Sequence, residues 1–234
     1  MSYVGHYVFQ ATSCQVKCYD PGMSKRRYEQ RLRAESAAET RQRILDALYD
    51  RLRDAPADPI SVDEVARIAR VARSTVYLVF GSRSGLFDAL TESLLQGAGY
   101  DRILEAVRHP DARETLRGGI EGGVHMYAAH RDVLRVLNSM AKLDPEGVGQ
   151  ALAGSERQRA AGMALLAGRL DEQGHLRPGV TADHAAHVIW ILAGFEVFDS
   201  LATGRGLPEQ AIADILVDTA EHALLAGDSS KAGR

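Results

Sequence analysis

The stretch ISVDEVARIARVARSTVYLVFGSRSGLFDAL, residues 60–90, decides the fold. Ser61 and Glu64 have the spacing of a capping box, which predicts that a short helix begins directly after the serine. Residues 70–73, Arg-Val-Ala-Arg, follow as a tight connection without glycine. Residues 81–82, Gly-Ser, end the next segment, and the serine is placed to cap a further helix. Apolar residues recur at helical spacing in the two outer segments, as Val62, Val65, Ala66 and Ile68 and then as Leu86, Phe87, Leu90 and Leu94.

The segment between the two turns, residues 74–80, is ambiguous on its own. Its sequence STVYLVF is β-branched and aromatic, which by propensity favours a strand. If the segment is a helix, it follows the first helix after a turn of three or four residues, with further helices bracing the pair. That arrangement is a helix-turn-helix, whose second helix can lie in the major groove of DNA.

The side chains at the start of this second helix suit contacts with DNA. Arg73 can pair with a guanine edge or a phosphate. Ser74 and Thr75 are short hydroxyl donors, and Tyr77 can reach a backbone phosphate. With the two capping serines and the arginine beside the second, the candidate DNA-binding residues are Ser61, Arg73, Ser74, Thr75, Tyr77, Ser82 and Arg83. The alternative is a plain packing module, in which Tyr77 is core and Arg73 is a solvated charge.

A further helix is expected before this module. Ser36 and Glu39 form another capping box, which predicts a helix start after Ser36. The helix ends within residues 54–59, where two prolines break it. Upstream lies a basic arm, which either contacts DNA phosphates and the minor groove or is a solvated helix extension. The arm contains Lys25, Arg26, Arg27, Arg31 and Arg33.

Composition narrows the class of protein. The chain has 234 residues, 45% hydrophobic and 6% aromatic, which favours a helical globular fold. It has no apolar run of about 18 residues and only two cysteines, which argues against a membrane span and a disulfide scaffold. The net charge of −3 is unevenly distributed. Residues 23–83 carry 13 Lys and Arg against 9 Asp and Glu, whereas residues 84–234 carry 14 against 21, which suggests that the basic part meets a polyanion.

Residues 1–22 differ from the rest of the chain. They lack helical periodicity and the features of a signal peptide, and Met23 would make a natural start. We therefore expect residues 1–23 to be a disordered extension or a start placed too early. Cys14, Cys18 and His6 raise the alternative of a metal site, but too few ligands accompany them.

Residues 100–234 predict five more helices. The first spans about 111–129, and a short second helix carries Val133, Leu134, Leu137 and Met140. A third covers Leu152 to Leu170, and a linker occupies residues 174–179. Thr181 caps a fourth helix, which continues through Phe195 and Val197, and Pro208 stands in the first turn of the last.

Two stretches carry a family resemblance, ETRQRILDALYDRLRD at residues 39–54 and the opening segment at residues 60–90. They resemble the DNA-binding domain of TetR-type bacterial transcription regulators. The resemblance implies that residues 74–80 are helical despite their composition. The sequence departs from the family pattern at Arg70, Ala72, Leu78 and Val79, which leaves the operator sequence open. The matching residues are Thr40, Arg41, Ile44, Leu45, Ala47, Ser61, Val65, Ala66, Val71, Thr75, Val76, Tyr77, Phe80, Ser82, Arg83 and Leu86.

The resemblance implies an all-α chain with a helix-turn-helix domain at residues 24–83, followed by a helical effector-binding and dimerisation domain at residues 84–227 and a tail at residues 228–234. It also implies a cytoplasmic homodimer that binds a palindromic double-stranded DNA operator. A small-molecule effector would release this repressor from DNA. We expect neither enzymatic activity nor a cofactor.

Two residue sets follow from the resemblance. The candidate effector-pocket residues, of a kind that is more often plain core, are Met126, Tyr127, Leu137, Met140, Met163, Trp190 and Phe195. The candidate dimer-interface residues, which could instead close the subunit core, are Ile189, Ala193, Ile212, Ile215, Leu216 and Thr219.

Two other functions stay open. One is a helical ligand-binding protein without a specific operator. The other is an enzyme or metal-binding protein that uses C-terminal histidines such as His184 and His187, three residues apart. The sequence contains no Gly-x-Ser-x-Gly elbow or His-Glu-x-x-His motif, and GGIEGG at residues 118–123 lacks the lysine and preceding strand of a phosphate loop.

Overall fold

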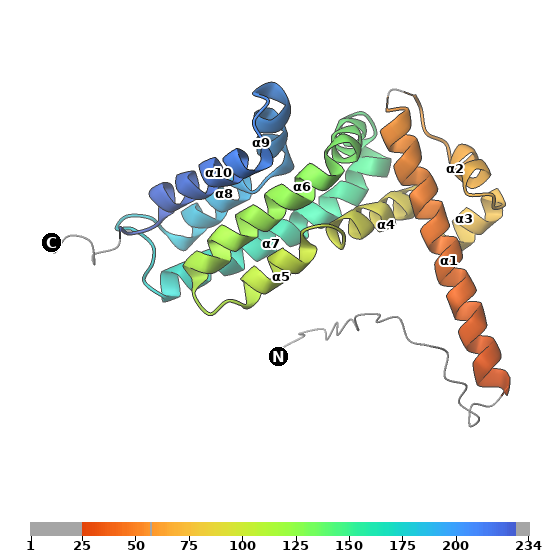
Figure 1. Ribbon diagram of the computed structural model, residues 1–234, viewed down its shortest axis with the longest axis horizontal. Helices are drawn as coiled ribbons and strands as arrows, with labels where there is room; N and C mark the ends of the chain where they lie inside the picture. The colour runs from red at the N-terminus through yellow and green to blue at the C-terminus, as the bar shows by residue number, and fades with distance from the viewer. Residues whose placement is uncertain (1–24, 57, 228–234) are drawn as a thin grey trace. The chain divides into compact units, whose positions relative to one another are not determined.

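The computed structural model describes residues 25–56 and 58–227, and every regular element within them is a helix (Figure 1). The predicted all-α fold class is therefore confirmed. The chain divides into two compact units, residues 1–41 and 42–234. The predicted N-terminal extension, with His6, Cys14, Cys18 and Met23, and the tail from residue 228 lie outside the described residues.

Helix α1, Lys25–Asp54, is longer than predicted. The capping box at Ser36 was wrong, because the helix is already formed when it reaches this serine. Residues 25–35 are mostly Arg, Glu, Gln and Leu, which favour helix, so nothing stops the helix from continuing through Ser36. Arg31 and Glu35 form an ion pair at 3.5 Å one turn apart in this segment. The helix ends just before Pro56, as predicted.

Three short helices follow α1 and build the helix-turn-helix. Ser61 Oγ accepts a hydrogen bond from Glu64 N at 3.1 Å, and Ser82 Oγ accepts one from Gly85 N at 2.9 Å, so both predicted caps are confirmed. Arg70, at the turn, has φ of 55° in the left-handed region, a conformation that glycine adopts far more readily than other residues. The helices are α2 (Val62–Ile68), α3 (Arg73–Phe80) and α4 (Arg83–Leu95).

Residues 74–80 are helical, as the resemblance implies. Helix α3 packs against α2 and α4, and Val76, only 1% exposed, anchors its inner face. Tertiary packing of this face outweighs the β-like propensity of the segment.

The first of two hydrophobic cores, called the first core below, extends from the helix-turn-helix into the following helices. It joins Ile44, Leu48 and Leu52 of α1 to residues of α2, α3 and α4, and it continues to Val133 and Leu137. No break in the core coincides with the predicted domain limit at residue 83. The domain limits therefore stay a prediction.

The remaining helices form a second layer around α6, which packs against α5, α7 and α10 (Figure 1). These helices enclose the second core, which contains Leu116, Ile120, Leu170, Ile189 and Leu216. The longer helices are α5 (Tyr100–Arg108), α6 (Ala112–Leu143), α7 (Gln150–Glu172), α8 (Ala182–Leu192) and α10 (Glu209–Leu224). The shorter segments are α9 (Phe195–Asp199) and two π-helical turns, η1 (Pro145–Gly149) and η2 (Ser200–Gly204).

Three predictions for this region were wrong. The helices expected at 111–129 and at Val133–Met140 are one helix, α6, because no proline or glycine separates them, although His130 has a non-helical φ/ψ of −121°/17°. The helix expected from Thr181 through Val197 breaks after Leu192, and Phe195 starts the separate helix α9. Helix α5 was not predicted at all.

The glycine-rich segment of α6 explains how α5 packs. A Cβ on Gly118 would lie 2.8 Å from Ala106 Cβ, and one on Gly122 would lie 2.8 Å from Ile103 Cγ1. These two glycines therefore let the helices approach closely. GGIEGG is a packing surface for α5, in agreement with its exclusion as a phosphate loop.

The lengths and apolar character of the helices bear on the predicted absence of a membrane span. Along the described chain, no single helix is long and apolar enough to cross a bilayer. The bent pair formed by Ala182–Leu192 and Phe195–Gly204 meets the length and composition requirements together.

Candidate nucleic-acid interface and pocket

The outer face of α3 combines polar groups with one large apolar side chain. Arg73, Ser74 and Tyr77 are exposed, and Leu78 is 86% exposed. Val76 faces inward, and Phe80 is half-buried against the first core. A short helix with one anchored face and one open face can present its outer side chains to a groove.

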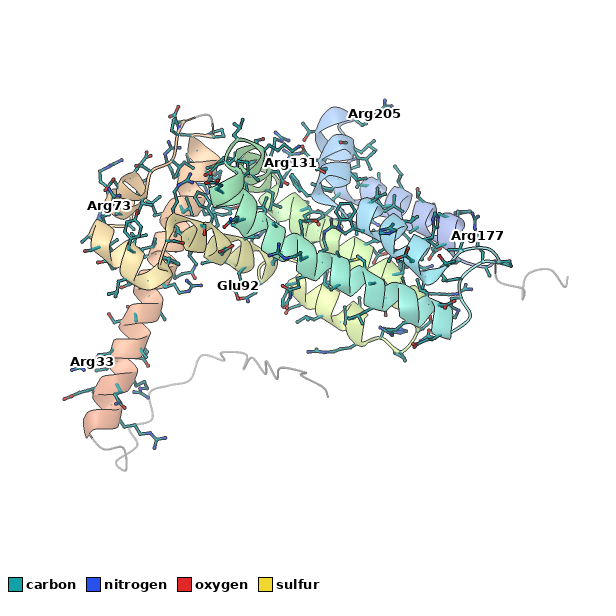
Figure 2. All side chains as sticks on the ribbon, turned by 180° about the vertical axis from the view of Figure 1, so that it is seen from behind. Arg33, Arg73, Glu92, Arg131, Arg177 and Arg205 are labelled. Atoms are coloured by element: carbon teal, nitrogen blue, oxygen red, sulfur yellow. The ribbon has the colours of Figure 1, made fainter. Side chains whose placement is uncertain are left out.

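Arg73 is held by partners from both helices of the module. Its Nη1 donates to Asp63 Oδ2 at 2.6 Å, and its Nη2 donates to Tyr77 OH at 3.4 Å. The guanidinium also lies 5.5 Å from the centre of the Tyr77 ring, and Figure 2 shows the side chain at the surface of the module. The hydrogen bonds to Tyr77 and Asp63 raise the pKa of Arg73, so its charge is fixed. Asp63 therefore positions Arg73 and must share it with any DNA ligand.

The three helix starts of the module differ in capping. Ser61 and Ser82 use their oxygens as caps, which leaves each O–H able to donate to a phosphate oxygen. Ala72, before α3, provides no side-chain cap. The first backbone N–H groups of α3 thus lack the side-chain acceptor that α2 and α4 have. A phosphate oxygen could accept hydrogen bonds from these N–H groups.

Arg83, a predicted phosphate contact, has an acidic partner within the chain. Its Nη1 donates to Asp144 Oδ2, which links the start of α4 to the end of α6. The guanidinium lies over the ring of Phe87 at 5.1 Å, and the hydrogen bond from Arg83 lowers the pKa of Asp144. A phosphate would have to compete with Asp144 for this arginine.

Arg51 positions α2 and was missed in the sequence. Its side chain is 8% exposed and donates to Glu64 Oε1 at 2.7 Å and to the carbonyls of Ala55 at 2.6 Å and Pro59 at 3.3 Å. Glu64, expected to complete a capping box, instead pairs with this arginine. The available signal was its place three residues after Leu48, on the apolar face of α1.

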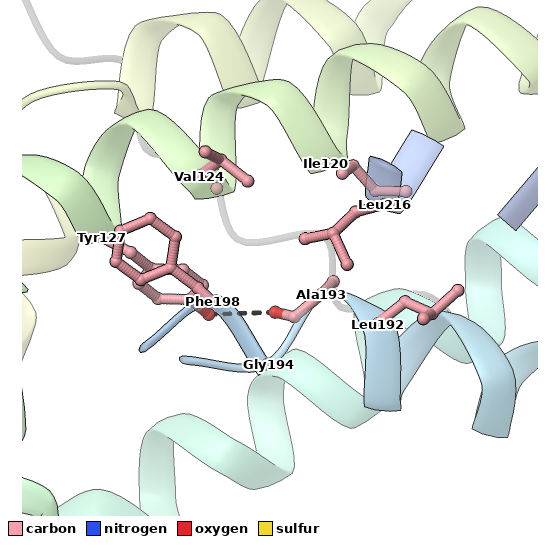
Figure 3. Close-up of a pocket in the computed structure, with 9 residues that line it drawn as sticks. Ile120, Val124, Tyr127, Leu192, Ala193, Gly194, Phe198 and Leu216 are labelled. Carbon is pink, nitrogen blue, oxygen red and sulfur yellow. Dashed lines mark hydrogen bonds between the residues drawn. The ribbon is translucent and has the colours of Figure 1, made fainter. Parts of the chain in front are cut away.

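A narrow apolar pocket lies where α8 gives way to α9 (Figure 3). Its cavity volume is about 10 Å³, about the space of one water molecule and far below the roughly 300 Å³ at which typical ligand pockets begin. A ligand of ordinary size would therefore have to widen it. The pocket is lined by Ile120, Gly123, Val124, Tyr127, Leu192, Ala193, Gly194, Phe198 and Leu216.

Tyr127 is the polar group of this pocket. Its hydroxyl donates to Ala193 O at 3.0 Å, drawn as a dashed line in Figure 3, and burial raises its pKa to about 12. Arg159 also caps the break, since its Nη1 donates to Trp190 O at 2.7 Å. The phenol stays protonated near neutral pH, so it can donate a hydrogen bond to a ligand that displaces the carbonyl.

The chain is similar in sequence and in structure to known proteins. No protein-family model matches the chain. A curated relative, the HTH-type transcriptional regulator EthR of Mycolicibacterium smegmatis, is 30% identical over 89 residues, which cover 37% of this chain and 41% of the relative. The chain thus spans about two fifths of the length of this relative.

Solved structures extend the likeness over most of the chain. NalD, the secondary repressor of the MexAB-OprM multidrug efflux pump in Pseudomonas aeruginosa, matches with a TM-score of 0.64 and 19% identity, over 83% of this chain and 100% of NalD. A TetR-like transcriptional regulator from Rhodococcus sp. RHA1 matches with a TM-score of 0.57 and 24% identity, over 79% of this chain and 94% of that one. This chain has the TetR-family fold. The resemblance seen in the sequence is confirmed.

Within the TetR-family fold, the predicted effector-pocket residues are scattered. Tyr127 lines the pocket, whereas Met126 is buried and Met163 and Phe195 are half-buried in the second core without lining it. Leu137 and Met140 belong to the first core, and Trp190 is 40% exposed. Apolar periodicity predicts which residues are buried, but not which core they belong to. The sequence therefore could not distinguish residues that line the pocket from residues that pack in a core.

Several of the predicted dimer-interface residues are already buried within the single chain, so fewer of them can contact a partner. Ile189, Ile212 and Leu216 are at most 3% exposed in the single chain, so their side chains belong to its own core. Ala193 lines the pocket. Ile215, 42% exposed, and Thr219 are open on α10, and they remain candidates for a dimer contact.

The histidine alternative gains no support from the geometry. His187 Nε2 lies 3.7 Å from Asp183 Oδ2, and both side chains are largely exposed. The part of the chain that the structure describes contains no group of three His, Cys, Asp or Glu side chains that could hold a metal ion.

Proposed function

We propose that the chain is a sequence-specific DNA-binding transcriptional regulator, a repressor that a small molecule releases from its operator. The observation that carries this proposal is the open face of α3, where Arg73, Ser74, Tyr77 and Leu78 point outward from an anchored helix-turn-helix. The basic charge of residues 23–83 favours a polyanionic partner.

The proposed regulator acts as a homodimer in the cytoplasm. A single eight-residue helix reads only a short DNA site, whereas two copies would reach major grooves roughly 34 Å apart. The exposed residues Trp190 and Ile191 of α8 and Ile215 of α10 are the proposed contact surface. Arg27, Arg31 and Arg33 of α1 supply the proposed phosphate contacts of the basic arm.

Helix α6 is the proposed link between ligand and DNA. Ile120, Val124 and Tyr127 line the pocket, while Val133 and Leu137, farther along the helix, belong to the core shared with the helix-turn-helix. The distortion at His130 lies between these two sets. A ligand that widens the pocket would therefore move α6 and, through the shared core and the Arg83–Asp144 pair, α4. It shifts the equilibrium only if it binds the DNA-free state more tightly.

A selection of genomic fragments tests the proposal. The full-length chain is mixed with DNA from the organism that encodes it, and bound fragments are sequenced and their affinities measured at several salt concentrations. We expect one palindromic site held at least about a thousandfold more tightly than bulk DNA. Uniform, weak binding to all fragments would contradict the proposal and favour a ligand-binding protein without an operator.

A further inference from the structure

Leu78 is the feature of the proposed interface that phosphate contacts do not explain. It is 86% exposed, although Val76 and Phe80 of the same helix pack inward and Val79 is half-buried. Exposed leucines are common on protein surfaces, and Leu143 is equally open at 87%. Exposure alone therefore decides nothing.

The position of Leu78 on its helix distinguishes it from the other exposed leucines. It stands one turn after Ser74, so both side chains occupy the same outward face of α3. Arg73 and Tyr77, joined to each other, lie directly beside this pair along the helix. Leu32 lies on α1, Leu143 ends α6 and Leu165 lies on α7, so none of them is on α3. Of these four leucines, Leu78 alone lies among the α3 residues that would enter the major groove.

The chemistry of the major groove then selects the contact. A leucine side chain neither donates nor accepts a hydrogen bond, so it gains nothing from the polar edges of adenine, guanine or cytosine. Thymine is the base that presents an apolar group there, its C5-methyl. Burying this methyl against Leu78 removes apolar surface of both groups from water.

We propose that Leu78 is a specificity-determining residue that reads a thymine C5-methyl in each half-site. The inference rests on the proposed function, because it requires α3 to lie in the major groove. The neighbouring Ser74 hydroxyl faces the same base step and supplies a polar contact beside the apolar one.

Uracil substitution tests this contact at the level of one methyl group. In the selected operator, each thymine is replaced in turn by uracil, which removes only the C5-methyl, and affinities are measured for the parent chain and for Leu78→Ala. We expect one position in each half-site to cost the parent about fourfold, the value of one buried methyl, and to cost Leu78→Ala nothing. Because Leu78 is exposed, the variant should melt as the parent does.

A matched variant and separate outcomes make the test decisive. Leu143→Ala removes an equally exposed leucine from α6 and should keep the parent's full uracil profile. If every uracil position costs the parent and Leu78→Ala equally, Leu78 does not read thymine, although the operator and the proposed function stand. If no specific operator is found, the proposed function and this inference both fall.

Discussion

The outward face of α3 and the pocket at the α8–α9 break are built in opposite ways. The α3 face takes all its side chains from eight consecutive residues, Arg73–Phe80. The pocket draws on α6, α8, α9, α10 and the break that separates α8 from α9. One site depends on local sequence and the other on how distant segments pack. The difference teaches that a binding surface is readable from sequence when one helix carries it, and hidden when several helices enclose it.

The largest expected effect comes from a charge placed on the α3 face. Ser74→Asp sets a carboxylate against the DNA phosphates, and we expect operator affinity to fall by at least about 100-fold at low salt. Stability should stay level or rise slightly, because an acidic group in the first turn of a helix favours its N-terminus. Operator titration and thermal melting measure the two effects separately.

A second serine provides the matched control for this change. Ser139 is exposed on α6, and Ser139→Asp adds the same charge to a helix outside the α3 face. It should leave operator affinity within about threefold of the parent, since screening weakens distant charges. Equal losses in the two variants would mean that overall charge, rather than contact by α3, controls binding.

The next effect concerns the pocket and should leave DNA binding intact. Added Cβ atoms at Gly123 and Gly119 of α6 would meet no atom within 4 Å, but Gly123 lines the pocket and Gly119 does not. Gly123→Val therefore places a side chain at the edge of the pocket, where it would hinder a ligand that widens the cavity, and we expect at least about tenfold more ligand to be needed for operator release. A library of small apolar molecules, screened for operator release, supplies the ligand.

Gly119→Val controls for the change of helix propensity, which is the same at both positions. Both variants should melt no lower than the parent, because valine is more favourable than glycine inside a helix by a few tenths of a kcal/mol. Ligand response should stay near the parental value in Gly119→Val. An unchanged response in Gly123→Val would place the ligand elsewhere.

Sequence reasoning succeeded where the signals were local. Ser61 and Ser82 were recognised as caps, since a capping serine needs only its own neighbours in the chain. It failed at Ser36, where the helix runs on through a good capping residue. The helical state of Ser74–Phe80 required the family resemblance, because packing of Val76 overrides local propensity.

The pocket and the ionic links were hidden for a different reason. Of the predicted pocket residues only Tyr127 lines the cavity, because lining depends on the break after Leu192 and on the approach of α10. Likewise, Asp144 lies 61 residues from Arg83, and no pattern along the chain pairs them. Contacts across such distances follow from tertiary packing rather than from periodicity.

A smaller effect should come from the Arg83–Asp144 pair, which connects the two regions. Asp144→Asn removes the competing charge but keeps an oxygen for Gly147 N, which donates to Asp144 Oδ1 at 3.0 Å. We expect operator affinity to rise about two- to fivefold and its salt dependence to steepen, because Arg83 becomes free to approach a phosphate. Asp132→Asn, which breaks the exposed pair with Arg131, should change neither quantity.

The pH of this experiment matters little near neutrality. The hydrogen bond from Arg83 holds the pKa of Asp144 below its ordinary 3.8, so the pair contributes stability above that value and loses it only as the pH falls through the lower one. Weaker operator binding by Asp144→Asn would show that the pair holds α4 in its reading position instead of withholding Arg83 from DNA.

The smallest effect concerns His130, at the distortion of α6 between the pocket and the shared core. Its Nδ1 lies 3.2 Å from Tyr49 OH, while its Nε2 is buried without a hydrogen-bond partner within residues 25–56 and 58–227. Burial lowers the pKa of His130 below the ordinary 6.5, so the folded chain favours the neutral ring. The unfolded chain therefore binds the proton first, and stability should decrease as the pH falls from about 6.5 through the lowered folded value. Urea unfolding of the parent and of His130→Gln at pH 7.5 and 5.5 should show a smaller loss in the variant, whereas equal losses would assign the pH dependence to other groups.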